Sequence, residues 1–355
     1  MDFFFISSTL HLMMAANMAI QDRSRKRIAV IIAKDTSATA RYAMLAGRFP
    51  NLFDEVVALS PLQGPSWRCL STPRFRTLKT LFTRPMDARL FTGNDRRIEF
   101  QYAMHIAMRA NRGRSIEGVY LDEGAVTYVG HKSMHTFQHR YVDPFFKKLF
   151  YGGWYRQALT TGTSAWVNTV YAAFPDRVHP LLQLKVVLLI DPQPFKTDAF
   201  KALAVAMLNG HDDYREALSG IRLVLTLPHE GSYTRNPEHY QQISQALLSV
   251  YAPASMAIKP HPRITDRERI ETLFPGFLLL DHTVGMEALL PLLGDGCRVV
   301  GDISSTLLTT RWLRPDLPVV AVLAATPPAE LSALYQHLQI PMVAPGELNH
   351  WLGAH

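Results

Sequence analysis

The sequence contains few cysteines and none of the short motifs that mark the commonest metal and nucleotide sites. Its two cysteines, Cys69 and Cys297, form no CxxC or Cys/His zinc spacing, which favours a reducing compartment. It has no Gly-x-Gly-x-x-Gly and no Walker loop, which excludes an ordinary NAD site and a P-loop ATPase. No Asp-x-Asp follows an apolar strand, and Asp212-Asp213 lacks that context, so a metal-bound diphosphate is not indicated.

The sequence also lacks a long uninterrupted apolar run. Phe3 to Ile6 and Leu10 to Ile20 are apolar, but no basic segment precedes them and polar residues interrupt them. The opening therefore predicts a strand, a turn and a helix rather than a signal peptide or a membrane span. We expect a cytoplasmic protein.

Positive charge is in moderate excess, with 37 Lys and Arg against 30 Asp and Glu, a formal net charge of +7. This excess favours anionic partners such as nucleotides, acidic glycans or an anionic membrane surface, although a merely basic surface is an equally good reading. The charge is not gathered into one long run, and nucleic acid is not among the expected partners. The densest patch is Arg23 to Arg27, which we expect in a surface turn.

Short apolar runs alternate with helical patterns along most of the 355 residues. This alternation is typical of an α/β fold with parallel sheets, and the length favours two Rossmann-like domains. Prolines gather between residues 175 and 194, so we expect domains at 1–180 and 181–340, with 341–355 packing back on the first. The clearest predicted strands are Phe3–Ser7, Arg27–Ala33, Glu55–Leu59, Gly118–Leu121, Ile221–Leu227, Ser255–Ile258 and Arg298–Gly301.

Residues 131–160 combine histidines, lysines and many aromatic side chains. His131, His135 and His139 have the i, i+4, i+8 spacing of one helix face, but no matching carboxylates accompany them, so no metal is expected. The aromatic residues suit either a packed cluster or a segment that lies on a membrane surface. Because the charges are few, the packed cluster is the preferred reading.

Three polar groups in the second half follow predicted strands or open helices, where α/β sheets bind ligands. In Lys259-Pro260-His261-Pro262, the prolines stiffen the turn that presents the histidine. Ser304, Ser305 and Thr306 open a helix whose free N–H groups suit an anion, although Ser304 could simply cap that helix. Glu287 could accept hydrogen bonds from a ribose or simply face solvent. Together these groups predict a nucleotide and phosphate site.

The first half has one acidic motif, Asp122-Glu123-Gly124, directly after a predicted strand. Adjacent carboxylates repel each other, which can raise the pKa of one of them and suit it to act as a general base. Gly124 lets the backbone turn or approach a ligand. An acidic turn after a strand is also common without any catalytic role.

This ordered set of motifs resembles the bacterial polysialyltransferases and the lipo-oligosaccharide sialyltransferases, which have the GT-B architecture of two domains facing across a cleft. The resemblance rests on the acidic-acidic-Gly motif at 122–124, His261-Pro262 and Ser304-Ser305, with Lys259 and Glu287 in matching places. The opening Ile6 to Leu12 looks like a variant of the family's first strand and Ser/Thr-rich loop, without its proline and glutamine.

The resemblance implies inverting, metal-independent transfer of a sialic acid or related nonulosonic acid from its CMP donor to a glycan hydroxyl, with no further cofactor. It implies Glu123 as the general base, with Asp122 as the alternative, and His261 on the leaving phosphate. The implied donor-binding residues are Lys259, Pro262, Glu287, Ser304, Ser305 and Thr306. The implied acceptor-binding residues are Ser8, Thr9 and Gly124.

Two other readings remain open. Enzymes that transfer glycerol phosphate from CDP-glycerol are similar in the second half, at Lys259 to Pro262 and Asp302 to Ser305. A non-catalytic basic module that binds an anionic glycan or lipid is the third reading. Asp122-Glu123-Gly124 favours the sialyltransferase over both.

Overall fold

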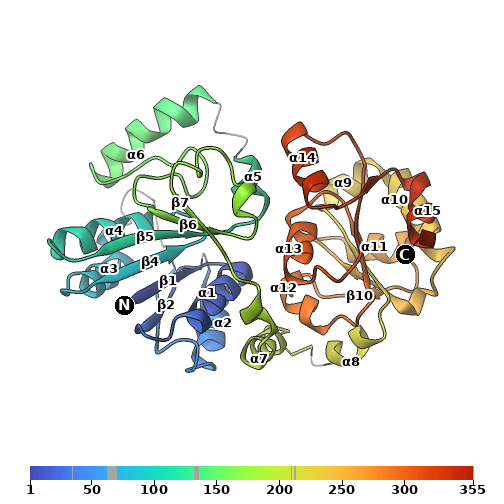
Figure 1. Ribbon diagram of the computed structural model, residues 1–355, viewed down its shortest axis with the longest axis horizontal. Coiled ribbons are helices and arrows are strands. Elements are labelled where there is room, and N and C mark those ends of the chain that lie inside the picture. Colours follow the sequence, from blue (N-terminus) through green and yellow to red (C-terminus); the bar gives the residue numbers. More distant parts are fainter. Residues whose placement is uncertain (34, 62–69, 132–135, 209, 212, 355) are drawn as a thin grey trace. The chain divides into compact units, whose positions relative to one another are not determined.

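The computed structural model describes residues 1–33, 35–61, 70–131, 136–208, 210–211 and 213–354. The chain divides into two compact units, Met1–Phe195 and Lys196–His355, which we call the first and second unit. Each unit is a parallel sheet with helices packed against it (Figure 1), so the expected α/β fold with two Rossmann-like domains is confirmed. Cys69, His135 and Asp212 lie outside the described residues.

The first unit contains a seven-stranded sheet in the order β3-β2-β1-β4-β5-β6-β7, with all neighbours parallel. Its middle strands are buried on both faces. This burial explains why β1 contains three consecutive phenylalanines instead of alternating apolar and polar residues. Phe4 stacks on Phe91 of β4, while Phe3 and Phe5 pack on Phe82 of the helix α3. The strands are β1 (Asp2–Ile6), β2 (Arg27–Ile31), β3 (Glu55–Ala58), β4 (Ala88–Thr92), β5 (Ile116–Leu121), β6 (Thr169–Ala172) and β7 (Val186–Leu189).

Two pairs of helices cover this sheet. The strand order reverses between β1 and β4, and right-handed crossovers therefore place α1 and α2 on one face and α3 and α4 on the other. The helices are α1 (Thr9–Gln21), α2 (Thr36–Gly47), α3 (Pro73–Phe82), α4 (Ile98–Ala110), α5 (Ala125–Val129) and α6 (Asp143–Tyr151).

The second unit contains a six-stranded parallel sheet in the order β10-β9-β8-β11-β12-β13. Its strands are β8 (Leu223–Thr226), β9 (Met256–Lys259), β10 (Leu278–Leu279), β11 (Arg298–Gly301), β12 (Val319–Val322) and β13 (Met342–Val343). Its helices are α7 (Asp198–Ala206), α8 (Tyr214–Ser219), α9 (Glu230–Arg235), α10 (Pro237–Leu248), α11 (Arg267–Leu273), α12 (Met286–Leu289), α13 (Ser305–Leu313), α14 (Ala329–His337) and α15 (Leu348–Ala354).

The limits of the two units differ from those expected at residues 180 and 340. Residues 181–195 belong to the first unit, because β7 pairs with β6 along its whole length. The terminal helix α15 belongs to the second unit rather than to the first. Leu348, Trp351 and Leu352 are buried there in the same apolar core as Tyr240 of α10.

The aromatic segment is not the packed cluster that the sequence favoured. A π-helical turn, Gln138–Val142, leads into α6, which has no buried residue and stands apart from the sheet (Figure 1). Phe137, Phe145 and Leu149 are 73%, 66% and 69% exposed, whereas His139, Tyr155, Ala158 and Thr160 are buried. The sequence shows that this segment is rich in aromatic residues. It does not show which face of the helix the rest of the fold would cover.

Neither a metal cluster nor a membrane-spanning helix is found in the described part of the chain. No three His, Cys, Asp or Glu side chains among these residues are grouped to hold an ion. His139, one of the three regularly spaced histidines, instead approaches Asp143 at 3.7 Å and stacks with His131. Over the same residues, each helix is too short or too polar to cross a bilayer.

Candidate functional site

The residues expected to bind the donor line one cavity of about 460 Å³ in the second unit. The cavity lies beyond the carboxyl ends of β8, β9 and β11, at the point where the strand order reverses. Open parallel sheets bind ligands at such switch points. The cavity brings together Lys259, His261, Pro262, Glu287, Ser304, Ser305 and Thr306. Their individual roles stay predictions.

Two histidines that line this cavity, His229 and His261, each have Nε2 available to donate a hydrogen bond to a ligand. Nδ1 of His261 accepts the backbone N–H of Arg263 at 3.1 Å, and Nδ1 of His229 accepts that of Gly231 at 3.2 Å. In a neutral imidazole the proton must then be on Nε2, which is left to donate to a ligand. Burial lowers the pKa of His261, and His229 lowers it further. A bound phosphate would raise that pKa again.

Two charged side chains of opposite sign line the inner part of the cavity, the buried Lys259 and the half-buried Glu287. The Lys259 ammonium donates to the carbonyl oxygens of Pro260 at 2.6 Å and His282 at 3.3 Å, so it braces the loop that carries His261. Burial lowers the pKa of Lys259 to about 8, opposed by the Glu287 carboxylate. Burial also raises the pKa of Glu287, which lies in the first turn of α12. Glu287 therefore faces the cavity rather than solvent.

Ser304 precedes α13 in the position of a capping residue, but its side chain makes no capping hydrogen bond. Its Oγ is buried and has no hydrogen-bond partner among the described residues, although Ser304 lines the cavity. The backbone is fixed because Ser304 N–H donates to Tyr335 Oη at 2.9 Å and Tyr335 Oη–H donates to Ser304 O at 2.8 Å. The first N–H groups of a helix also lack intrahelical partners, so Oγ and these groups are suited to bind an anion. A plain capping role for Ser304 is not supported.

In the first unit, the two carboxylates of the acidic motif have different surroundings. Asp122 is 2% exposed and accepts hydrogen bonds from Gly124 N at 2.8 Å, Ala173 N at 2.9 Å and the Tyr128 hydroxyl. Burial raises its pKa, opposed by these donors. Gly124 has φ 84°, a conformation that favours glycine. Asp122 and Gly124 therefore build the turn that presents Glu123.

Glu123 is 27% exposed and lies against a buried histidine. His11 Nε2 approaches Glu123 Oε1 at 3.6 Å, and Ser7 Oγ lies 3.0 Å from His11 Nδ1. Asn94 Nδ2 lies 3.5 Å from the same Glu123 oxygen. A β-carbon at Gly93 would lie 2.1 Å from His11 Nε2, so glycine makes room for the histidine. The carboxylate is thus oriented from one side and open on another, as a general base requires.

Two of the three residues expected to bind the acceptor, Ser8 and Thr9, have structural contacts in this conformation. Ser8 Oγ accepts the backbone N–H of His11 at 3.2 Å and caps α1. Thr9 Oγ1 lies 3.4 Å from the Tyr42 hydroxyl. Both follow β1, beside the switch point of the first sheet. Their contact with an acceptor stays a prediction.

Three residues at these two places were missed from the sequence. His229 had a signal, because Pro228-His229 follows β8 just as Pro260-His261 follows β9. His11 and Asn94 had none, since only the fold brings them to Glu123.

Comparison with known proteins identifies solved structures that share this fold. No protein-family model and no curated protein sequence matches the chain. Among solved structures, it is similar to an α/β-galactoside α-2,3-sialyltransferase from Photobacterium phosphoreum, with TM-score 0.61, 12% identity and 98% of each chain covered. It is also similar to the GT-B domain of a sialyltransferase from Photobacterium damselae, with TM-score 0.54, 12% identity, and 97% of this chain and 99% of that chain covered.

An enzyme of a different class shares the architecture. The chain is similar to a UDP-GlcNAc 2-epimerase from Neisseria meningitidis, with TM-score 0.52, 12% identity, and 99% of this chain and 91% of that chain covered. At this identity the likeness establishes the architecture and not the reaction. The chain therefore has the GT-B fold of two Rossmann-like domains, which sugar-nucleotide transferases and epimerases both use.

Proposed function

We propose that this chain is an inverting glycosyltransferase that moves a sialic acid, or a related nonulosonic acid, from its CMP donor to a hydroxyl of a glycan acceptor. The observation that carries the proposal is the unpartnered, buried Ser304 Oγ at the start of α13, beside two histidines that present Nε2. A nucleoside monophosphate suits this arrangement, because its phosphate can accept from the hydroxyl, the imidazoles and the helix N–H groups together.

The donor phosphate is the leaving group in this reaction. As the bond from the anomeric carbon to the phosphate oxygen breaks, the electron pair stays on that oxygen and negative charge grows there. His261, His229 and the charge of Lys259 stabilise it, which is the main electrostatic task of the site. Because these side chains supply the positive charge, we expect the reaction to proceed without a metal ion, and EDTA to leave the rate unchanged.

Glu123 takes the proton of the acceptor hydroxyl as its oxygen attacks the anomeric carbon from the face opposite CMP. His11 and Asn94 lie beside one oxygen of this carboxylate, at 3.6 Å and 3.5 Å. Asp122 is the less suitable base, because three donors already occupy its oxygens. The acceptor then binds at the edge of the first sheet where β1, β4 and β5 end.

We also propose that the enzyme works at the cytoplasmic face of an anionic membrane. The exposed stripe on the π-helical turn and α6 supports this, with large apolar side chains at Phe137, Tyr141, Phe145 and Leu149. Amphipathic helices of this kind lie in the membrane interface, aided by basic residues such as Arg140 and Lys148.

Vesicle sedimentation tests the membrane surface. Wild-type protein should sediment with phosphatidylglycerol vesicles, and Phe145→Ser with Leu149→Ser should release it. The control is Met108→Ser, which removes an exposed apolar side chain from α4, where Met108 is 49% exposed. Equal sedimentation of the double variant and the wild type would contradict the assignment.

Nucleotide-dependent thermal stability tests the donor. A ligand that binds only the folded chain raises its melting temperature in proportion to the logarithm of its concentration. CMP should stabilise the protein more than UMP, GDP or UDP-GlcNAc. A preference for CDP over CMP would favour glycerophosphate transfer from CDP-glycerol instead, and a preference for UDP-GlcNAc would favour an epimerase.

A further inference from the structure

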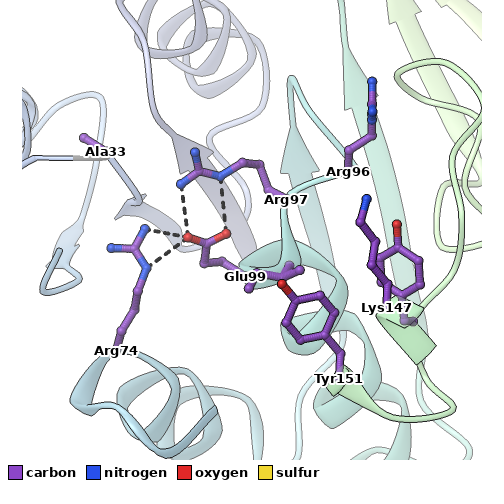
Figure 2. A pocket seen from close by; sticks show the side chains of 9 residues that line it. Ala33, Arg74, Arg96, Arg97, Glu99, Lys147 and Tyr151 are labelled. Carbon is purple, nitrogen blue, oxygen red and sulfur yellow. Dashed lines mark hydrogen bonds and ion pairs between the residues drawn. The ribbon is translucent and has the colours of Figure 1, made fainter. Parts of the chain in front are cut away.

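The first unit contains a second cavity, of about 430 Å³, that the proposed reaction does not yet use. It lies under α6, between the end of β2 and the start of α4, and Figure 2 shows its side chains. It is lined by Ala33, Arg74, Arg96, Arg97, Ile98, Glu99, Lys147, Tyr151 and Tyr155. Four of these side chains are cationic and one is anionic.

Two of the four cations are committed to the fold. Glu99 lies between Arg74 and Arg97, at 2.8 Å and 3.0 Å (Figure 2). Both arginines also donate to the carbonyl oxygen of Ile32 at the end of β2, at 2.9 Å and 2.6 Å. Arg74 and Glu99 are each 1% exposed. This cluster ties β2 to α4, and its single carboxylate cannot balance both guanidinium groups.

The other two cations have no carboxylate partner in the described part of the chain. The Arg96 guanidinium forms no hydrogen bond or ion pair there, and the Lys147 ammonium lies 5.7 Å from the ring centroid of Tyr155. Burial lowers the pKa of Lys147, Asp143 opposes that shift, and Arg96 adds to it, so the two cations act on each other. Helix α4 also begins at this cavity, and its N-cap residue Arg97 makes no capping hydrogen bond. An anion would relieve this accumulated positive charge.

The cavity is on the same edge of the sheet as the proposed base. Arg96 N–H donates to Asn94 Oδ1 at 3.1 Å, and Asn94 Nδ2 faces Glu123. The charges of both places also act on His131: burial lowers its pKa, Arg96 lowers it further, and Glu123 opposes that shift. An acceptor whose hydroxyl reaches Glu123 can therefore extend along the loop after β4 toward Arg96.

We infer that this cavity, called here the Arg96/Lys147 pocket, binds an oxyanion on the acceptor glycan, so that the acceptor is an acidic rather than a neutral sugar chain. The role of the bound glycan as acceptor rests on the proposed transferase function. A carboxylate or a phosphate ester would each satisfy Arg96, Lys147 and the N–H groups of α4.

Calorimetric binding without donor tests the inference directly. The ligands are sialyllactose, its neutral methyl ester, a phosphorylated lactose and inorganic phosphate. Sialyllactose or the phosphorylated sugar should bind at least about 10-fold more tightly than the methyl ester, since charge-assisted hydrogen bonds are lost in the ester. The sugar acid that binds more tightly identifies the anion.

Matched variants locate the effect. Arg96→Gln with Lys147→Gln should abolish the preference for the acid, and Arg96→Lys with Lys147→Arg should restore part of it. Arg112→Gln with Lys79→Gln removes the same charge from exposed positions and should keep the preference. Equal binding of acid and ester, an equal loss in the control pair, or binding of inorganic phosphate alone would overturn the inference.

The CMP melting experiment separates this inference from the proposed function. If CMP stabilises the protein but no acidic sugar binds at the Arg96/Lys147 pocket, the inference alone is wrong. If the acidic sugar binds there but CMP has no effect, the transferase proposal is wrong and the pocket remains an acidic-glycan site.

Discussion

The depressed pKa of Lys259 predicts how CMP binding should depend on pH. In the free protein burial brings this pKa to about 8. Lysine loses its charge as pH rises, so the attraction for a phosphate is present below pH 8 and lost above it. If only the protonated form binds, the dissociation constant scales as 1 + 10^(pH − pKa), so it should rise about 10-fold between pH 7 and pH 9.

Isothermal titration calorimetry of CMP over this range measures the effect. The phosphate of CMP is already doubly charged above pH 7, since its second pKa is about 6. In the free protein, burial keeps the pKa of His261 below its ordinary value, so Lys259 rather than His261 titrates within this window before CMP binds. Binding at pH 8 should also take up about half a proton, visible as a dependence of the heat on buffer ionisation.

The control is Lys259→Met, which retains the apolar stem and removes the ammonium. Its CMP affinity should be weaker at pH 7 and nearly constant from pH 7 to pH 9. A constant affinity in the wild type, or the same slope in the variant, would refute the assignment of this positive charge to the donor phosphate.

Four further substitutions test individual parts of the two sites. Glu123→Gln should lower transfer at least about 100-fold with CMP affinity unchanged, whereas Asp122→Asn should lower the free energy of unfolding by about 1–3 kcal/mol in urea titrations. Ser304→Ala should leave the urea midpoint in place but weaken CMP about 10-fold or more, because its Oγ has no partner in the free protein. Gly93→Ala should displace His11 and lower kcat more than it changes the KM for the donor, as stopped assays with varied CMP-sugar would measure. Normal transfer by Glu123→Gln or Gly93→Ala, or unchanged CMP binding by Ser304→Ala, would contradict the corresponding role.

Several of the strands that the sequence predicted well are buried on both faces. β1 and β2 are continuous apolar runs because they lie in the middle of the first sheet. β4 was missed although it lies beside β1. Arg89 interrupts its apolar pattern, and this arginine is tolerated because Asp2, 87 positions earlier, and Asp22 both pair with it. Because β4 was not predicted, the loop that follows it, with Asn94 and Arg96, was not recognised as part of a site.

The donor cavity could be predicted to a greater extent than the acceptor side. Each donor residue follows a recognisable strand or opens a helix, and a switch point gathers such positions automatically. Pro228-His229 followed the same rule and could have been found by applying it to β8. The environment of Glu123 could not, because His11 reaches it only through the space that Gly93 leaves. The exposure of the aromatic stripe on α6 could not be predicted from the sequence either, because it depends on tertiary packing.

Transfer from CMP-sialic acid to an acidic glycan is the measurement that tests the central proposal most directly. The wild type should release CMP from CMP-sialic acid only after the acceptor is added, and each acceptor molecule should gain one nonulosonic acid. His261→Ala and Glu123→Gln should each reduce both signals at least about 100-fold. Turnover of CDP-glycerol or UDP-GlcNAc in place of CMP-sialic acid, or full activity in both variants, would contradict the account.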